Sequence, residues 1–251
     1  PDPALDADAG AIAEVDASAG DDADGDDGDD ATAEAAIADD ATAGVDAMAS
    51  EPIWQEVAGG EDCRCADGSD WSFWVREADP AKVVLYFQGG GACFDATSCS
   101  FTTGTYKVTG GSEDDPTGAD GIFDFDNQAN PLADWSFVFV PYCTGDVHLG
   151  DNRQDYGDGL VVDHNGFVNG EFALEHLVER FGEAGEVFVT GSSAGGVPAP
   201  LFAGLVSDRL PDAAVTVLAD GSGAYADSPA VNAAIGALWG TFANVPSWEV
   251  N

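Results

Sequence analysis

The sequence has very few positively charged residues. It contains 7 Lys and Arg against 47 Asp and Glu, which gives a formal net charge of −40. Nucleic acids and anionic membrane surfaces are both bound mainly through clusters of basic side chains. A chain with so few cations offers no such surface, so we expect neither nucleic acid nor an anionic membrane as a partner.

Long apolar runs and metal-ligand clusters are missing as well. No run of about 18 apolar residues occurs, so no membrane span is predicted. The chain has 5 Cys but no C-x-x-C pair, and only 3 His, so we expect no zinc cluster. The sequence begins at Pro1 without a signal peptide, and we therefore expect a processed or shortened chain.

Residues 1–50 lack aromatic and basic side chains and consist mainly of Ala, Asp and Gly. Such a segment cannot bury enough apolar surface to offset the entropy lost on folding. We expect an acidic disordered linker over residues 1–50 and one domain over residues 51–251. The Asp-rich run at 21–30 fails the EF-hand pattern, because Asp27 stands where the loop needs Gly and Ala33 where it needs Glu. No specific metal site is expected.

The predicted domain is itself acidic. Of the 47 acidic residues 16 lie in residues 1–50, so residues 51–251 hold 31 acidic residues and all 7 basic ones. Such a domain repels itself at low salt, as halophilic proteins do. We therefore hypothesise a saline habitat; the alternative is an acidic surface without adaptive meaning. The melting temperature should rise from low to molar salt by more than ordinary charge screening produces, and a rise no larger than screening would contradict the hypothesis.

Apolar runs alternate with amphipathic segments after residue 70. Strands are predicted at 71–75, 81–88, 135–140, 187–190 and 214–218, helices at 171–181, 195–210 and 229–242, and long loops at 94–131. Asn169 is expected to cap the first helix, whereas Pro198 and Pro200 should delay or kink the second. Strands that alternate with helices predict an α/β fold with a mostly parallel central sheet flanked by helices.

One predicted strand runs directly into Gly191-Ser-Ser-Ala-Gly195, which matches G-x-S-x-G. Between a strand and a helix, this pattern is typical of the nucleophile elbow of α/β-hydrolases, a sharp turn that exposes the serine oxygen. We therefore predict Ser193 as a nucleophile and the amide of Ala194 as a donor to an oxyanion. Gln88-Gly-Gly-Gly91 follows an earlier strand and is expected to supply the second donor, although a flexible turn is the alternative.

Five motifs occur in order: FQGGGACF (87–94), PYCTGDVHLGD (141–151), DHNGFVNG (163–170), GSSAGG (191–196) and LADGSGAY (218–225). Together they resemble the pectin acetylesterase family, which also contains the carboxylesterase Notum. The resemblance covers residues 63–225 and is far more specific than G-x-S-x-G alone. It implies an α/β-hydrolase fold, hydrolysis of carboxylic esters, and no cofactor. It also implies Ser193 as the nucleophile, with Gly90, Gly91 and Ala194 lining the oxyanion hole.

The resemblance also implies a disulfide between Cys93 and Cys99. The pairing of Cys63, Cys65 and Cys143 stays open, since an odd count leaves at least one cysteine unpaired. Disulfides are typical of exported proteins, so we expect a secreted or cell-surface tethered protein. Its oligomeric state is left open.

The base for Ser193 is not evident. In α/β-hydrolases the acid and the histidine follow the serine, whereas His148, His164 and His176 all precede it. We therefore expect the catalytic histidine and acid beyond Asn251, and a hydrolase domain that is incomplete at its C-terminus. Recruitment of His148 or His164 as the base is the alternative.

Other polar residues are candidates for the site without being assigned to the triad. Asp146 and His148 share one loop and are candidates to line the cleft, although a hydrogen-bonding role in that loop is favoured for His148. His176 is expected to be structural. Asp220 ends a predicted strand and is expected to shape the site rather than to act as the triad acid.

These observations favour a secreted serine carboxylesterase that deacetylates or deacylates a polysaccharide such as pectin, through an acyl-enzyme on Ser193. Neither fold nor family fixes the substrate or the acyl length. A general esterase or lipase is one alternative, and a non-catalytic binding module on a hydrolase scaffold is another. Because no base follows Ser193, the chain by itself is expected to show little turnover.

Overall fold

The computed structural model describes residues 52–110, 114–223 and 228–248. The predicted linker over residues 1–50, with its Asp-rich run, lies outside the described residues. None of the helices in the described ranges is long and apolar enough to cross a membrane.

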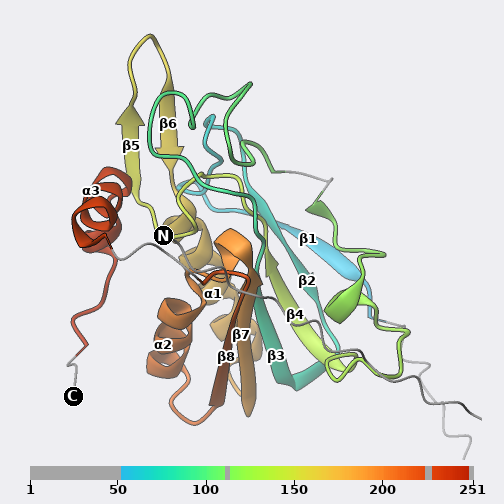
Figure 1. Ribbon diagram of the computed structural model, residues 1–251. Coiled ribbons are helices and arrows are strands. Elements are labelled where there is room, and N and C mark those ends of the chain that lie inside the picture. Colours follow the sequence, from blue (N-terminus) through green and yellow to red (C-terminus); the bar gives the residue numbers. More distant parts are fainter. Residues whose placement is uncertain (1–51, 111–113, 224–227, 249–251) are drawn as a thin grey trace, which may run out of the picture. The chain divides into compact units, whose positions relative to one another are not determined.

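A six-stranded sheet in the order β1-β2-β4-β3-β7-β8 forms the centre of the domain (Figure 1). Its strands are β1 (Trp54–Ala58), β2 (Ser72–Arg76), β3 (Asp79–Phe87), β4 (Trp135–Val140), β7 (Glu186–Ser192) and β8 (Ala214–Asp220). Strands β4, β3, β7 and β8 are parallel, while β1 and β2 are antiparallel to their neighbours. The prediction of an α/β fold with a mostly parallel sheet is confirmed.

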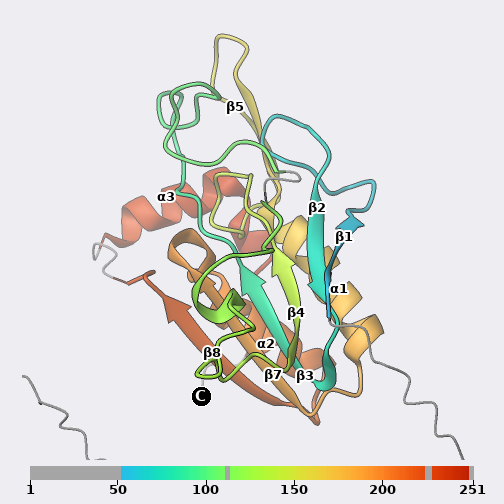
Figure 2. The same cartoon turned by 90° about the vertical axis from the view of Figure 1, so that its right-hand side faces the viewer.

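The two faces of the sheet are covered differently. Helices α1 (Gly166–Phe181) and α2 (Ala199–Arg209) lie on one face, as Figure 2 shows. Because successive side chains of a strand point to opposite faces, Leu85 and Phe87 of β3 pack with these helices. Val84 points the other way, into a cluster with Phe137 and aromatic residues of the segment at 121–134. In the described ranges this largely irregular segment, which contains the 3₁₀ turn η2 (Gly121–Phe123), covers the second face.

Helix α1 begins earlier than predicted, and the predicted Asn169 cap is wrong. Asn169 lies within the helix, where its buried side chain accepts a hydrogen bond from the amide of Arg64 (3.1 Å). The first turn is held at Gly166, whose amide donates to Asp146 Oδ2 (2.7 Å). Gly170 has a packing role, since a Cβ there would lie 2.6 Å from Cζ of Phe202. Close packing therefore keeps two glycines in a helix that their propensity disfavours.

The other two helices also differ from their predicted bounds. Helix α2 starts only at Ala199, after the 3₁₀ turn η3 (Ser193–Gly195), so the delayed start expected from the prolines is confirmed. Helix α3 (Pro229–Trp239) ends before the predicted residue 242, because Gly240 adopts φ 77° and closes it.

Three strands were not predicted. Strands β5 (Asn152–Asp155) and β6 (Val161–His164) form an antiparallel hairpin, seen at the top of Figure 1, and β1 forms one edge of the main sheet. The sequence of β5, NRQD, is wholly polar and gives no apolar alternation from which a strand could be recognised.

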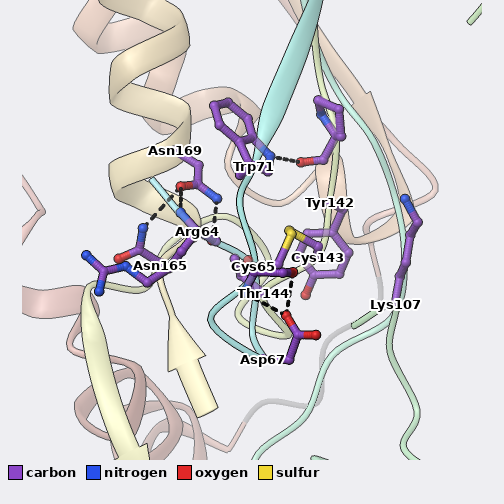
Figure 3. The surroundings of a disulfide bond; sticks show 12 residues. Arg64, Cys65, Asp67, Trp71, Lys107, Tyr142, Cys143, Thr144, Asn165 and Asn169 are labelled. Atoms are coloured by element: carbon purple, nitrogen blue, oxygen red, sulfur yellow. Dashed lines mark hydrogen bonds between the residues drawn. A yellow bond between two sulfur atoms is a disulfide. The ribbon is translucent and has the colours of Figure 1, made fainter. Parts of the chain in front are cut away.

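Two disulfides connect the described cysteines. Cys93 pairs with Cys99, the pair that the family resemblance implied, and Cys65 pairs with Cys143, while Cys63 is a buried free thiol. Figure 3 shows Asn169 of α1 reaching toward Arg64 and Asn165 beside the second bridge. The Cys65–Cys143 bridge thus ties the segment before β2 to the residues that follow β4, close to the N-terminal turns of α1.

Candidate active site

Ser193 occupies a strained and exposed position at the end of β7. Its φ of 53° is in the left-handed region, which costs a non-glycine residue free energy. Ala194 and Gly195 beside it are buried. A Cβ on Gly195 would lie 2.0 Å from the carbonyl oxygen of Phe87, and one on Gly191 would lie 2.3 Å from that of Gly195. The backbone packing therefore requires both glycines of the motif and leaves the serine exposed between them.

The glycine loop after β3 lies next to this serine. Strands β3 and β7 are paired, with Phe87 opposite Gly191, so the segments that follow both strands leave the same edge of the sheet. A Cβ on Gly89 would lie 2.6 Å from the carbonyl oxygen of Ser192 and 3.2 Å from Cβ of Ser193. The structure thus brings together two segments that are about a hundred residues apart in the sequence.

Three backbone amides in these two segments lack a protein acceptor. In the part of the chain that the structure describes, the amides of Gly90, Gly91 and Ala194 donate to no protein acceptor. The carbonyl oxygen of Gly90, in contrast, accepts from the amide of Lys107 at 2.8 Å. Unpaired backbone amides beside an exposed serine are what an oxyanion hole requires.

The side chain of Gln88 anchors the start of the loop. Its Oε1 accepts from the amide of Tyr142 at 3.0 Å, and its Nε2 donates to Oδ1 of Asp114 at 3.0 Å. Asp114 is buried and forms an ion pair with Lys107, whose ammonium group also reaches Oε1 of Gln88 at 3.4 Å. This network was not predicted, because no spacing rule connects Gln88 with a lysine and an aspartate in the loops that follow.

His148 and Asp146 are both buried beside the loop. His148 is 1% exposed, and its Nε2 donates to the carbonyl oxygen of Gln88 at 2.9 Å. Burial lowers the pKa of His148 to about 4, so the imidazole is neutral at pH 7. The Asp146 carboxylate accepts from the amides of His148 (3.1 Å) and Gly166 (2.7 Å). Asp146 thus supports the loop and the N-terminus of α1, where the helix dipole favours a negative charge.

The remaining candidates lie in different surroundings. His164 is buried, which lowers its pKa; its Nδ1 donates to the carbonyl oxygen of Thr144 (2.9 Å) and its Nε2 accepts from the hydroxyl of Tyr156 (2.8 Å). His176 on α1 contacts the ring of Phe73. Asp220 is exposed at the end of β8, where it pairs in register with Ser192 and so lies beside the elbow. Within the described ranges, no histidine or carboxylate forms a hydrogen bond with the side chain of Ser193.

One group of side chains has the proximity needed for a metal. Cys93, Cys99 and His164 place their ligand atoms within 4.8 Å of one another in the described part of the chain. The two sulfur atoms are already joined in a disulfide, and both ring nitrogens of His164 are engaged in hydrogen bonds. The group is therefore a packed structural cluster and offers no free ligand atoms.

An apolar cavity of about 410 Å³ adjoins the glycine loop and the elbow. Ala92, which follows the glycines, and Val197, which follows the elbow, both line it, and α3 contributes Ile235 and Trp239. Trp239 is fixed in place, because its indole donates to the carbonyl oxygen of Cys93 at 2.9 Å. The cavity is thus lined by apolar residues from α3 and from the segments that follow the glycine loop and the elbow.

The fold and the site together define an α/β protein with an exposed serine at a sharp turn after β7, next to a glycine-rich loop with unpaired amides. The Pectinacetylesterase family model matches residues 52–246, and the chain belongs to this family.

Two relatives illustrate the similarity. Pectin acetylesterase 5 of Arabidopsis thaliana is 27% identical over 163 residues, which cover 62% of this chain and 38% of the relative. The palmitoleoyl-protein carboxylesterase NOTUM of Homo sapiens is 29% identical over 159 residues, which cover 58% of this chain and 30% of the relative. The match thus spans well under half the length of these curated relatives.

Proposed function

We propose that this protein is a serine carboxylesterase that forms an acyl-enzyme on Ser193. The observation that carries the proposal is the exposed serine in a left-handed backbone conformation beside the unpaired amides of Gly90, Gly91 and Ala194. Strain of this kind persists only where the surrounding structure enforces it, and it is frequent at catalytic sites. Membership of the pectinacetylesterase family supports the same chemistry.

In the proposed reaction the Ser193 hydroxyl attacks the ester carbonyl while a general base takes its proton. The carbonyl oxygen becomes an oxyanion that accepts hydrogen bonds from the loop amides and from Ala194. Collapse of this intermediate expels the alcohol, which receives the proton, and leaves an acyl-enzyme that water hydrolyses to the free acid. The described histidines contact other residues and form no hydrogen bond with Ser193. The base is therefore proposed to be a residue outside the described ranges.

We propose an acylated polysaccharide, such as acetylated pectin, as the substrate. Support comes from similarity to proteins named pectin acetylesterase. The net charge of −40 would repel an acidic polysaccharide at low salt, but the Debye length shrinks to about 3 Å in 1 M salt. Secretion is proposed as well, supported by the two disulfides, which are typical of oxidising compartments.

The apolar cavity favours a second candidate, an esterase for longer acyl chains. A cavity of about 410 Å³ is much larger than an acetyl group needs, and burying each methylene there contributes about 0.8 kcal/mol. Turnover of p-nitrophenyl esters from acetate to decanoate separates the two candidates. A deacetylase should prefer acetate, whereas use of the cavity should raise kcat/KM with chain length.

Labelling with a fluorophosphonate probe tests the nucleophile. In the protein as the organism makes it, the probe should form one adduct, and peptide mass spectrometry should locate that adduct on Ser193. Heat-unfolded protein is the control, because the reaction needs the folded elbow. A folded protein whose Ser193 stays unlabelled would defeat the proposal and favour the non-catalytic binding module.

A further inference from the structure

The ring of His148 is enclosed directly beneath the glycine loop. Its centroid lies 5.1 Å from that of Phe87 and 4.8 Å from that of Tyr142, so one aromatic ring precedes the loop and the other follows β4. The ring therefore has little rotational freedom, and its Nε2–H is directed at the carbonyl oxygen of Gln88.

The backbone that presents this ring is itself strained. Val147 and His148 have φ values of 51° and 56°, two consecutive left-handed residues without a glycine. The amide of His148 donates to Asp146, and the amide of Val147 donates to the hydroxyl of Tyr142 at 3.0 Å. Asp146 packs closely against the backbone of Gly150, since a Cβ there would lie 2.3 Å from Oδ2 of Asp146. The surrounding structure thus maintains an unfavourable conformation that holds the imidazole in place.

Fixing one carbonyl fixes the next amide, because the peptide unit is planar and trans. The carbonyl oxygen of Gln88 and the amide of Gly89 belong to one such unit, and His148 binds its oxygen side. The carbonyl oxygen of Gly90 and the amide of Gly91 belong to another, and the amide of Lys107 binds its oxygen side at 2.8 Å. Hydrogen bonds to alternate carbonyls therefore orient the amides of Gly89 and Gly91.

We propose that His148 is a positioning residue for the oxyanion loop: its Nε2–H holds the carbonyl of Gln88, fixes the Gln88–Gly89 peptide unit, and so sets the direction in which the loop carrying the amides of Gly90 and Gly91 leaves β3. This inference rests on the proposed function of Ser193. It gives His148 a role in catalysis without contact with the substrate. The neutral imidazole that burial favours suits this role, because it needs only one donor on Nε2.

Two substitutions of His148 distinguish a positioning role from a role as the general base and from a purely structural role. His148→Phe keeps a flat ring but removes the donor, and His148→Gln keeps an N–H group at a similar reach. Both place a non-glycine residue at the same φ, so their backbone costs are matched. Turnover of p-nitrophenyl acetate is measured in the protein as the organism makes it, together with the melting temperature of each variant.

We expect His148→Phe to lower kcat by about 10- to 100-fold with KM little changed, because misplaced oxyanion donors weaken binding of the transition state only. His148→Gln should stay within about threefold of the wild type. If His148→Phe does not fold, His148→Met provides the comparison without a donor.

Three results would overturn the inference. Unimpaired kcat in a folded donor-less variant would show that the hydrogen bond does not position the loop. Loss of all activity in a folded His148→Gln variant would show that His148 is itself the base. A wild type inert to every ester tested would defeat the proposed function and the positioning role together. The first result leaves the proposed function intact, and the second changes only its assignment of the base.

Discussion

Replacing Ser193 with glycine should abolish acylation and stabilise the fold at the same time. The backbone at Ser193 has φ 53°, where a residue with a Cβ is disfavoured by about 1 kcal/mol and glycine is not. Removing the hydroxyl removes the only proposed nucleophile, so turnover should fall by at least about a thousandfold. Urea unfolding should give a higher midpoint for the variant, while fluorophosphonate labelling should disappear.

Replacing the neighbouring Ser192 with glycine is a matched control, whose expected effect on the unfolding free energy has the opposite sign. Ser192 has an extended backbone, with φ −105° and ψ 142°, and its Oγ accepts a hydrogen bond from the hydroxyl of Tyr86 at 3.1 Å. Ser192→Gly should therefore lower the unfolding free energy by about 1 kcal/mol and leave Ser193 labelled. A Ser193→Gly variant less stable than the wild type would show that the elbow is not strained. Labelling that survives in that variant would show that another residue is the nucleophile.

Local sequence pattern was sufficient for five of the six strands of the central sheet, all but the edge strand β1. The run WSFVFV predicts β4 with its observed bounds, Trp135–Val140, and the ends of β3, β7 and β8 lie within two residues of their predictions. These strands are recognisable because they are short runs of β-branched and aromatic residues. The start of α1 was missed because its helical state depends on Asp146 and Phe202, which are distant in the sequence. Helix propensity is a property of single residues, so it does not reveal a glycine that is required by the side chain of a distant residue.

In the candidate site too, residues within a local motif were predicted, and contacts between distant residues were not. The prediction of Ser193 as a nucleophile depends on one local motif, and the structure places it beside the loop that Gly90 and Gly91 occupy. The contacts that hold this loop join residues about 20 to 60 positions apart, such as His148 with Gln88. Such pairs depend on how β3 and β4 align, which a single sequence does not reveal.

Adding one methyl group at Gly195 should damage both the fold and the site. The Cβ of Gly195→Ala would lie 2.0 Å from the carbonyl oxygen of Phe87 and 2.8 Å from that of Gln88. Both are backbone atoms, which cannot rotate out of the way as a side chain can. Either β7 moves away from β3 or the elbow shifts, and we expect a loss of about 3 kcal/mol or more in the unfolding free energy.

The same displacement should impair acylation in the molecules that stay folded. Phe87 and Gln88 lead directly into the oxyanion loop, so a shift that relieves the clash also moves the amides of Gly90 and Gly91 relative to Ser193. Gly185→Ala is the matched control, because its Cβ would meet only the carbonyl oxygen of Ala81 at an ordinary 3.9 Å. Urea unfolding should place Gly185→Ala within about 0.5 kcal/mol of the wild type. Equal unfolding midpoints for the two variants would mean that the elbow tolerates a side chain at Gly195, and that close backbone contact does not hold Ser193 in place.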